Sequence, residues 1–161
     1  MSVPIGSQTV INYKLGAIFD VNKISLSQLL SKHTYCRVKK SSKHGVGVFA
    51  IKDIPKYINP FYGPLKTKWL AISPKSLNKV DQEVATMVRA FFSLQNGLFW
   101  VPEGGLNSID ISFFMNTSKK PNVSTDSDGD SFYTLRKIKK GEELTIDYQI
   151  FDEQRYPFVI E

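Results

Sequence analysis

The sequence predicts a mostly β, α+β domain in which short antiparallel strands are interrupted by one inserted helical segment. Three observations favour this fold class. Short runs of β-branched and aromatic residues alternate with turn signals, one stretch has helical periodicity, and the regular strand-helix alternation of a doubly wound parallel sheet is missing. A length of 161 residues with 42% hydrophobic content suits a single compact domain with one core.

The first strands are predicted in the N-terminal half. Tyr35–Lys40 and Val46–Ile51 are β-prone runs, and Ser41–Gly45 between them has the composition of a hairpin turn. Tyr57–Tyr62 is a third such run and predicts another strand. Together these runs indicate a small antiparallel sheet near the start of the domain.

Two helices are predicted from capping signals. Ser25 precedes a weaker helical pattern over Leu26–Lys32. Ser73-Pro74 is the strongest start signal in the chain, an N-cap followed by proline, and this helix is expected to end at Asn96-Gly97. Its apolar residues recur at spacings of three and four: Leu77, Val80, Val84, Met87, Val88 and Phe91.

Short strands return after the helical segment. Leu98–Val101, Phe132–Arg136 and Glu143–Tyr148 have strand composition, with turns expected at Asp128-Gly129 and Lys140-Gly141. The C-terminal half is therefore predicted to add further short strands.

Composition excludes several classes of protein. Cys36 is the one cysteine, so an intramolecular disulfide and a zinc site built from several cysteines are excluded. His33 and His44 are not spaced as metal ligands, so no metal site is expected. The sequence shows no secretory signal and no apolar run long enough to cross a bilayer, which predicts a soluble, intracellular protein. With 21 Lys and Arg against 15 Asp and Glu, the net charge of +6 favours acidic partners.

Two motifs resemble binding loops but lack the required context. Gly45–Ala50 fits G-x-G-x-x-A, yet the residues after the glycines favour a strand, whereas a dinucleotide fingerprint has to open a helix. Asp126–Asp130 resembles the start of a calcium loop, but Ser131 and Lys137 stand where an EF-hand needs glycine and glutamate. A tight turn and a solvated hairpin tip are the simpler interpretations.

Three segments, taken in order, resemble the SET domain of protein-lysine methyltransferases. Lys43–Ala50 is similar to the family's G-x-G segment, Phe113–Asn122 to R-F-x-N-H-S-C-x-P-N, and Lys139–Tyr148 to G-E-E-L-T-x-D-Y. The resemblance implies a SET-type fold over residues 35–150. Residues 1–34 are then expected to be an extension that packs on the domain, and residues 151–161 a short C-terminal segment without a zinc cluster.

The second segment departs from the family pattern at three positions. Phe113, Thr117 and Lys119 stand where the family usually has Arg, His and Cys. Four positions keep the family residues: Asn116, Ser118, Pro121 and Asn122. The substitutions leave open a non-catalytic SET-like module that binds a nucleosome or a partner protein. A basic, β-rich nucleic-acid binder is a third hypothesis.

The resemblance implies a binding site for S-adenosyl-L-methionine, with S-adenosyl-L-homocysteine as product. Tyr148 is the expected catalytic tyrosine, and Tyr62 is expected to line the lysine channel. The expected cofactor contacts are His44, Gly45, Val46, Gly47, Phe114, Asn116, Thr117 and Tyr156. Ile146 occupies the position associated with the number of methyl groups added, and that number stays open.

The implied function is S-adenosylmethionine-dependent protein-lysine N-methylation of a histone tail or a similar basic protein. The lysine has to reach the methyl donor uncharged, which an apolar channel favours because it removes water from the amine. A protein of net charge +6 repels a basic tail at long range, so nucleosomal DNA is the expected contact of its basic surface. Such a protein is expected at chromatin or in the nucleus.

Overall fold

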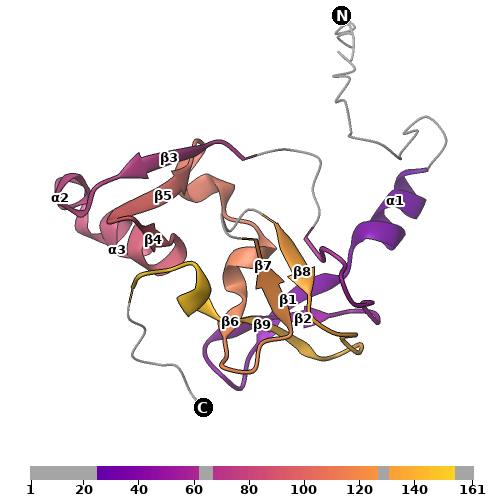
Figure 1. Ribbon diagram of the computed structural model, residues 1–161. Coiled ribbons are helices and arrows are strands. Elements are labelled where there is room, and N and C mark those ends of the chain that lie inside the picture. The colour runs from indigo at the N-terminus through magenta and orange to yellow at the C-terminus, as the bar shows by residue number, and fades with distance from the viewer. Residues whose placement is uncertain (1–24, 62–66, 127–130, 155–161) are drawn as a thin grey trace, which may run out of the picture.

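The computed structural model describes residues 25–61, 67–126 and 131–154. These residues form three small sheets, with strand orders β1-β2-β9-β6, β3-β5-β4 and β7-β8 (Figure 1). The predicted mostly β, α+β class of short, largely antiparallel sheets with an inserted helical segment is confirmed. The helices and strands are α1 Leu26–His33, β1 Cys36–Lys40, β2 Val46–Ala50, β3 Trp69–Ile72, α2 Pro74–Leu77, α3 Gln82–Phe91, β4 Leu94–Gln95, β5 Leu98–Pro102, β6 Asn116–Thr117, β7 Val123–Thr125, β8 Phe132–Thr134 and β9 Glu143–Ile146. Three 3₁₀ turns complete the described ranges: η1 Gly105–Ser108, η2 Ile111–Phe114 and η3 Tyr148–Ile150.

The predicted first helix is confirmed as α1. Ser25 and Gln28 form a reciprocal capping box at its start. Its C-terminal end is held by the Lys52 ammonium, which donates to the carbonyl oxygens of Ser31 at 2.5 Å and Lys32 at 2.9 Å. A cation at this end also complements the helix dipole. None of the α1 residues is buried, so this helix contributes no side chain to the core.

The predicted hairpin is confirmed as β1 and β2. The Ser41 amide donates to the Gly45 carbonyl at 3.0 Å, and Gly45 has a φ of 47°, a conformation that glycine adopts without steric cost. β2 then pairs antiparallel with β9, and β6 pairs parallel with β9 on its other side. The strand β9 therefore lies at the centre of the four-stranded sheet.

The strand predicted over Tyr57–Tyr62 is wrong for the part of it that the structure describes. Tyr57 has a positive φ of 64°, and turns replace the strand. Thr134 explains the local path: its carbonyl accepts from the Tyr57 amide at 2.9 Å, and its hydroxyl oxygen accepts from the Ile58 amide at 3.1 Å. Tyr62 lies outside the described residues.

The single helix predicted from Ser73 to Asn96 is also wrong, because the segment forms α2 and α3. The Asp81 carboxylate caps α3 by accepting from the amides of Glu83 at 2.9 Å and Val84 at 3.4 Å. This second cap starts a new helix inside the apolar periodicity. After α3 the chain enters β4, and a turn at Asn96-Gly97 with positive φ at both residues leads to β5.

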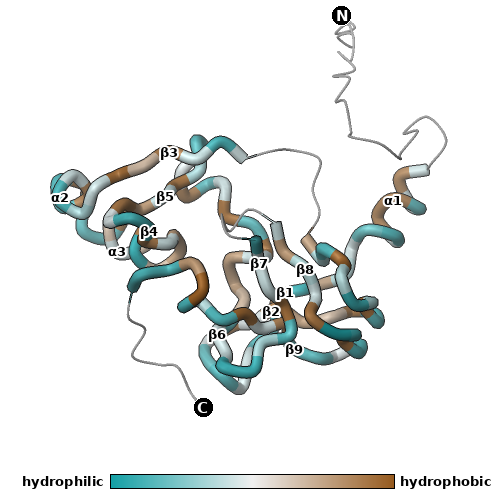
Figure 2. Tube along the Cα trace, in the orientation of Figure 1, coloured by the Kyte–Doolittle hydropathy of each residue, from teal (hydrophilic) through white to brown (hydrophobic). Residues whose placement is uncertain are grey.

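The buried residues form two clusters rather than the one core expected. The first, around the four-stranded sheet, contains Cys36, Val48, Ala50, Ile54, Met115, Val123, Ile138, Leu144 and Ile146. The second, in the inserted segment, contains Leu77, Ala85, Val88, Phe92 and Phe99. Figure 2 shows hydrophobic stretches of the trace in both parts of the molecule.

Two neighbouring phenylalanines of η2 join these clusters. The ring of Phe113 packs edge-on against Phe92, with centroids 5.6 Å apart, and that of Phe114 packs against Phe91 at 5.7 Å. Such aromatic pairs add about 0.5–1.5 kcal/mol beyond the burial of their area. Phe113, which replaces the arginine of the family pattern, thus has a packing role here.

A short segment after η3, Asp152–Gln154, ties the two parts together a second time. We call it the C-terminal latch. The Glu153 carboxylate accepts from the amides of Asn96 at 2.7 Å and Gly97 at 3.2 Å. The buried Asp152 carboxylate accepts from the Leu94 amide at 3.1 Å. The latch therefore fixes the chain that follows Tyr148 against the β4–β5 hairpin.

Candidate active site

The structure brings the three motif segments together at β9. Val48 of β2 pairs with Leu144, and Asn116 of β6 pairs with Thr145. Beyond the strands, the Ser118 amide donates to the Ile146 carbonyl at 2.9 Å. The glycine hairpin, the Asn-Thr-Ser segment and the Asp-Tyr strand end are therefore neighbours in one sheet, although about 70 residues separate the first two in sequence.

The side chain of Asn116 lies at the centre of this arrangement. Its Nδ2 is 3.3 Å from the His44 carbonyl oxygen, 3.1 Å from the Val46 carbonyl oxygen and 2.7 Å from Oε1 of Glu143. An amide nitrogen carries two hydrogens, so three acceptors share two donors. The cluster has a surplus of acceptors and attracts further N–H donors.

The carboxylate of Glu143 occupies the space above Gly47. A Cβ at position 47 would lie 2.2 Å from Oε1 of Glu143 and 3.0 Å from Nδ2 of Asn116. The Ser41 hydroxyl donates to the same carboxylate, 2.8 Å from Oε1 and 3.0 Å from Oε2. The second glycine of the G-x-G segment thus makes room for a polar side chain of β9, a role that the sequence did not indicate.

Tyr148 follows β9 and is partly buried. Its amide donates to Oγ1 of Thr117 at 3.3 Å, and its hydroxyl donates to the Met115 carbonyl oxygen. The Phe151 ring packs edge-on against its ring, with centroids 6.0 Å apart. Burial, and secondarily the negative charge of Asp152, raises the pKa of the Tyr148 phenol to about 12. The phenol is therefore a neutral hydrogen-bond donor at physiological pH.

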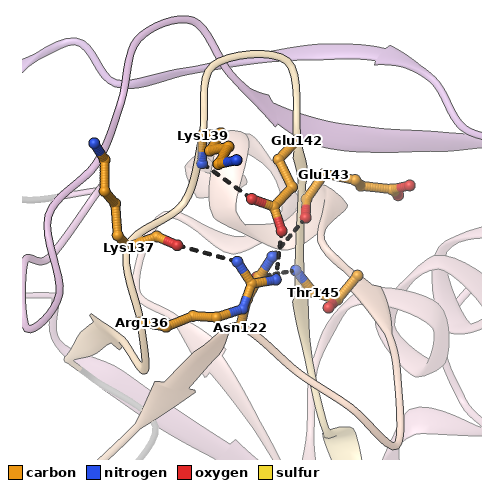
Figure 3. Close-up of polar contacts among 7 residues, drawn as sticks. All are labelled: Asn122, Arg136, Lys137, Lys139, Glu142, Glu143 and Thr145. Atoms are coloured by element: carbon orange, nitrogen blue, oxygen red, sulfur yellow. Dashed lines mark hydrogen bonds and ion pairs between the residues drawn. The ribbon is translucent and has the colours of Figure 1, made fainter.

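Asn122 connects the second motif segment to β9 from inside the protein. It is 3% exposed. Its Nδ2 donates to the Glu143 carbonyl at 2.8 Å, and its Oδ1 accepts from the Thr145 amide at 2.9 Å (Figure 3). The side chain pairs with the main chain of β9 as a neighbouring strand would. Asn122 thus holds the main chain of Glu143 and Thr145 in place.

Glu142 and Glu143 are adjacent in sequence but have different surroundings. Glu142 forms an ion pair with Arg136 and accepts from the Lys139 amide at 3.0 Å (Figure 3). The hydrogen bond from Arg136 is the largest cause of the lowered pKa of the Glu142 carboxyl. Glu143 instead contacts Ser41 and Asn116. Strand alternation places the two carboxylates on opposite faces.

The remaining predicted site residues fall into three groups. His44 and Val46 contribute carbonyl oxygens to the Asn116 cluster, with Gly45 in the turn between them. The Phe114 ring packs between the two buried clusters. Tyr62 and Tyr156 lie outside the described residues. Sequence comparison by motif alone did not single out Ser41 and Glu143 as site residues.

Comparison with known proteins identifies the family. The SET domain family profile matches residues 45–149, which is more than half of the chain, and the chain therefore belongs to the SET-domain family. Members of this family are generally protein-lysine methyltransferases. A search of curated proteins finds no match.

A solved structure was also found to be similar. It is a crystal structure from Plasmodium falciparum that is described as that of a proposed histone methyltransferase. The identity is 17% and the TM-score 0.48, over 71% of this chain and 93% of the other. Membership of the family rests on the domain match.

The described residues contain neither a cluster of metal-ligating side chains nor a helix that could cross a membrane. Within residues 25–61, 67–126 and 131–154, no group of three or more His, Cys, Asp and Glu side chains could hold a metal ion. The helices in the same ranges are all too short or too polar to span a bilayer.

Proposed function

We propose that the protein is an S-adenosylmethionine-dependent protein-lysine N-methyltransferase. One observation carries the proposal: the acceptor cluster around Asn116 and the hydroxyl-bearing Tyr148 are joined through paired β6 and β9. A cofactor amine could bind at the first, and a reacting amine could be oriented at the second. Membership of the SET-domain family supports this assignment of roles.

The acceptor cluster suits the amino-acid end of S-adenosyl-L-methionine. An ammonium group has three N–H donors and no acceptor, and the cluster offers the carbonyl oxygens of His44 and Val46. Asn116 would bind this end of the cofactor, and the backbone from Gly45 to Gly47 would lie beside it. The bound cofactor supplies a methyl group on a positively charged sulfur. Contacts from Phe114, Thr117 and Tyr156 remain proposals that rest on the family resemblance.

Tyr148 would orient the substrate amine. Its hydroxyl hydrogen is donated to the Met115 carbonyl, so the phenol oxygen can accept a hydrogen bond from the amine N–H, and the buried Ile146 and the Phe151 ring provide apolar surroundings. An apolar environment and a nearby positive charge both lower the pKa of a lysine amine, so the nucleophile is uncharged when it reacts. A protein base is not required for this step. Tyr62 is proposed to line the same channel.

A basic edge of the protein suggests how it meets its substrate. Arg37, Lys39 and Lys40 are exposed on β1, an outer strand of its sheet, and Lys43 is exposed in the following turn. Within the described residues, none of these four forms an ion pair with a carboxylate. We call this surface the β1 basic edge. Lys68 and Lys137 contrast with it, because each is paired with an acid.

We propose that the β1 basic edge contacts DNA while a histone-tail lysine enters the site. Unpaired cations in a row can replace the counterions of a phosphate backbone. The same charges repel a free basic tail, so a nucleosome offers a more favourable target than an isolated histone. This proposal places the protein at chromatin.

Methylation assays test the function directly. The protein is incubated with methyl-labelled S-adenosylmethionine and with histones or nucleosomes, and modified peptides are identified by mass spectrometry. We expect a methylated lysine and a higher melting temperature in the presence of the cofactor or S-adenosylhomocysteine. A folded protein that shows neither methylation nor stabilisation would instead be a non-catalytic interaction module.

The DNA contact predicts a distinct salt dependence. Replacing both Arg37 and Lys39 by glutamine should weaken binding to duplex DNA and lower the slope of log K against log salt by about 2, or roughly one per lost phosphate contact. Lys75→Gln with Lys79→Gln removes the same charge from the inserted segment and should leave the slope unchanged. Equal effects of the two double variants, measured by fluorescence anisotropy, would contradict a specific role for the β1 basic edge.

A further inference from the structure

The orientation of the Asn116 amide is determined by its neighbours. Its Nδ2 faces the carbonyl oxygens of His44 and Val46 and the carboxylate of Glu143. Turning the amide by half a rotation would point Oδ1 at three acceptors, which is electrostatically unfavourable. Glu143 is the closest of the three, at 2.7 Å, and the only one that is charged. Charge-assisted hydrogen bonds are about twice as strong as neutral ones.

This orientation leaves Oδ1 of Asn116 available. Within the described ranges it has no hydrogen-bond partner, whereas Nδ2 has three. Asn116 is also not fully buried. The hydrogen bonds of Nδ2 fix the direction in which Oδ1 points. Oδ1 can therefore accept from an N–H donor without first reorienting.

We propose that Glu143 is a positioning residue that presents Oδ1 of Asn116 to an N–H group of the cofactor. The inference rests on the proposed function and deepens it. Ser41 supports Glu143 by donating to both carboxylate oxygens, and Gly47 leaves the space that the carboxylate fills. These residues link the hairpin, β9 and β6 in one polar network. Glu143 acts through Asn116 and touches no reacting atom.

Cofactor binding by variants at position 143 tests this role. Affinity for S-adenosylhomocysteine is measured by titration calorimetry for wild type, Glu143→Ala, Glu143→Gln and the control Glu142→Gln. Loss of a hydrogen bond to a charged group predicts about a tenfold to hundredfold weaker Kd for Glu143→Ala. Glutamine keeps an acceptor for Nδ2 and should recover most of this loss. Glu142→Gln, whose carboxylate faces Arg136, should bind as wild type does.

A second readout separates positioning from simple structural support. At saturating cofactor, turnover of Glu143→Ala should stay within about twofold of wild type, because the effect is confined to cofactor binding. Gly47→Ala provides an independent variant: its Cβ would displace the flexible end of Glu143 and lie 3.0 Å from Nδ2 of Asn116, so the protein should fold with this contact disturbed and show a weakened Kd. This variant also keeps the test valid if Glu143→Ala does not fold.

The outcomes distinguish the two proposals. If wild type binds neither the cofactor nor its product, the proposed function fails and the positioning role fails with it. If wild type binds and folded Glu143→Ala or Gly47→Ala binds equally well, only the positioning role is overturned. It is also overturned if Glu143→Gln binds the cofactor product as weakly as Glu143→Ala does and both variants lower the melting temperature by the same amount. That result would indicate structural support alone.

Discussion

Replacing Tyr148 by phenylalanine is expected to lower methyl transfer by about a hundredfold to a thousandfold, the effect typical of losing one well-placed donor in an active site. The affinity for S-adenosylhomocysteine should change by less than about twofold, because the Asn116 cluster is intact. The reason lies in the geometry of the strand end. The Tyr148 amide is fixed by Thr117, so the truncated ring keeps its place and loses the hydroxyl together with its hydrogen bond to the Met115 carbonyl.

A matched control is available on another strand. Tyr133 of β8 is 37% exposed and takes no part in the proposed site. Tyr133→Phe should therefore retain the wild-type rate when both variants are measured in a single-turnover methylation assay. Unchanged turnover in Tyr148→Phe would remove the hydroxyl from any role in the reaction.

The pKa of Tyr148 adds a pH dependence to this prediction. Burial first, and the charge of Asp152 second, raises it from 10.0 to about 12. A raised pKa means that the folded protein favours the neutral phenol, so this contribution to stability is complete below pH 10 and is lost between pH 10 and about 12. Urea unfolding across this window should show a smaller alkaline loss in Tyr148→Phe than in wild type. Across the range where enzymes are assayed, Tyr148 donates a hydrogen bond and is no general base.

Replacing Asn122 by alanine is expected to destabilise the fold by about 2–5 kcal/mol, since each buried group left unpaired costs about 1–3 kcal/mol. In wild type, the Glu143 carbonyl and the Thr145 amide pair with the Asn122 side chain. The variant leaves both of these main-chain groups without a hydrogen-bond partner. Urea denaturation monitored by circular dichroism measures the loss.

An exposed asparagine provides the comparison for this variant. Asn78→Ala removes an acceptor for Arg89 at the protein surface and should cost less than about 0.5 kcal/mol. An unfolding midpoint for Asn122→Ala equal to that of Asn78→Ala would mean that water replaces the lost amide at β9. The same result would remove Asn122 from the framework that supports the site.

Local signals in the sequence predicted the local parts of this fold. The cap at Ser25 and the turn at Gly45 act over a few residues, and the structure confirms both. The Asp81 cap was missed because apolar periodicity continues across it. The strand expected at Tyr57 was wrong because hydrogen bonds to Thr134, far along the chain, determine the local backbone.

The candidate site shows the same division between local and long-range information. The motifs pointed to Asn116 and Tyr148, and the structure places both beside β9. Ser41 and Glu143, which are 102 residues apart, meet because of the register of the central sheet. No local pattern encodes such a pair. The function of Asn122 was equally hidden, because its partners are main-chain atoms rather than side chains.

In the described part of the chain, hydrogen bonds join the latch to the main chain of the inserted segment. Asp152 and Glu153 accept from the amides of Leu94, Asn96 and Gly97, and the Gln154 side chain donates to the carbonyls of Arg89 and Phe92. These contacts use no side chain of the inserted segment, but they depend on the length and shape of the Asn96-Gly97 turn. Exposed side chains of this insertion can therefore be varied without affecting the latch contacts, whereas a residue added to or deleted from that turn would release the chain that follows Tyr148.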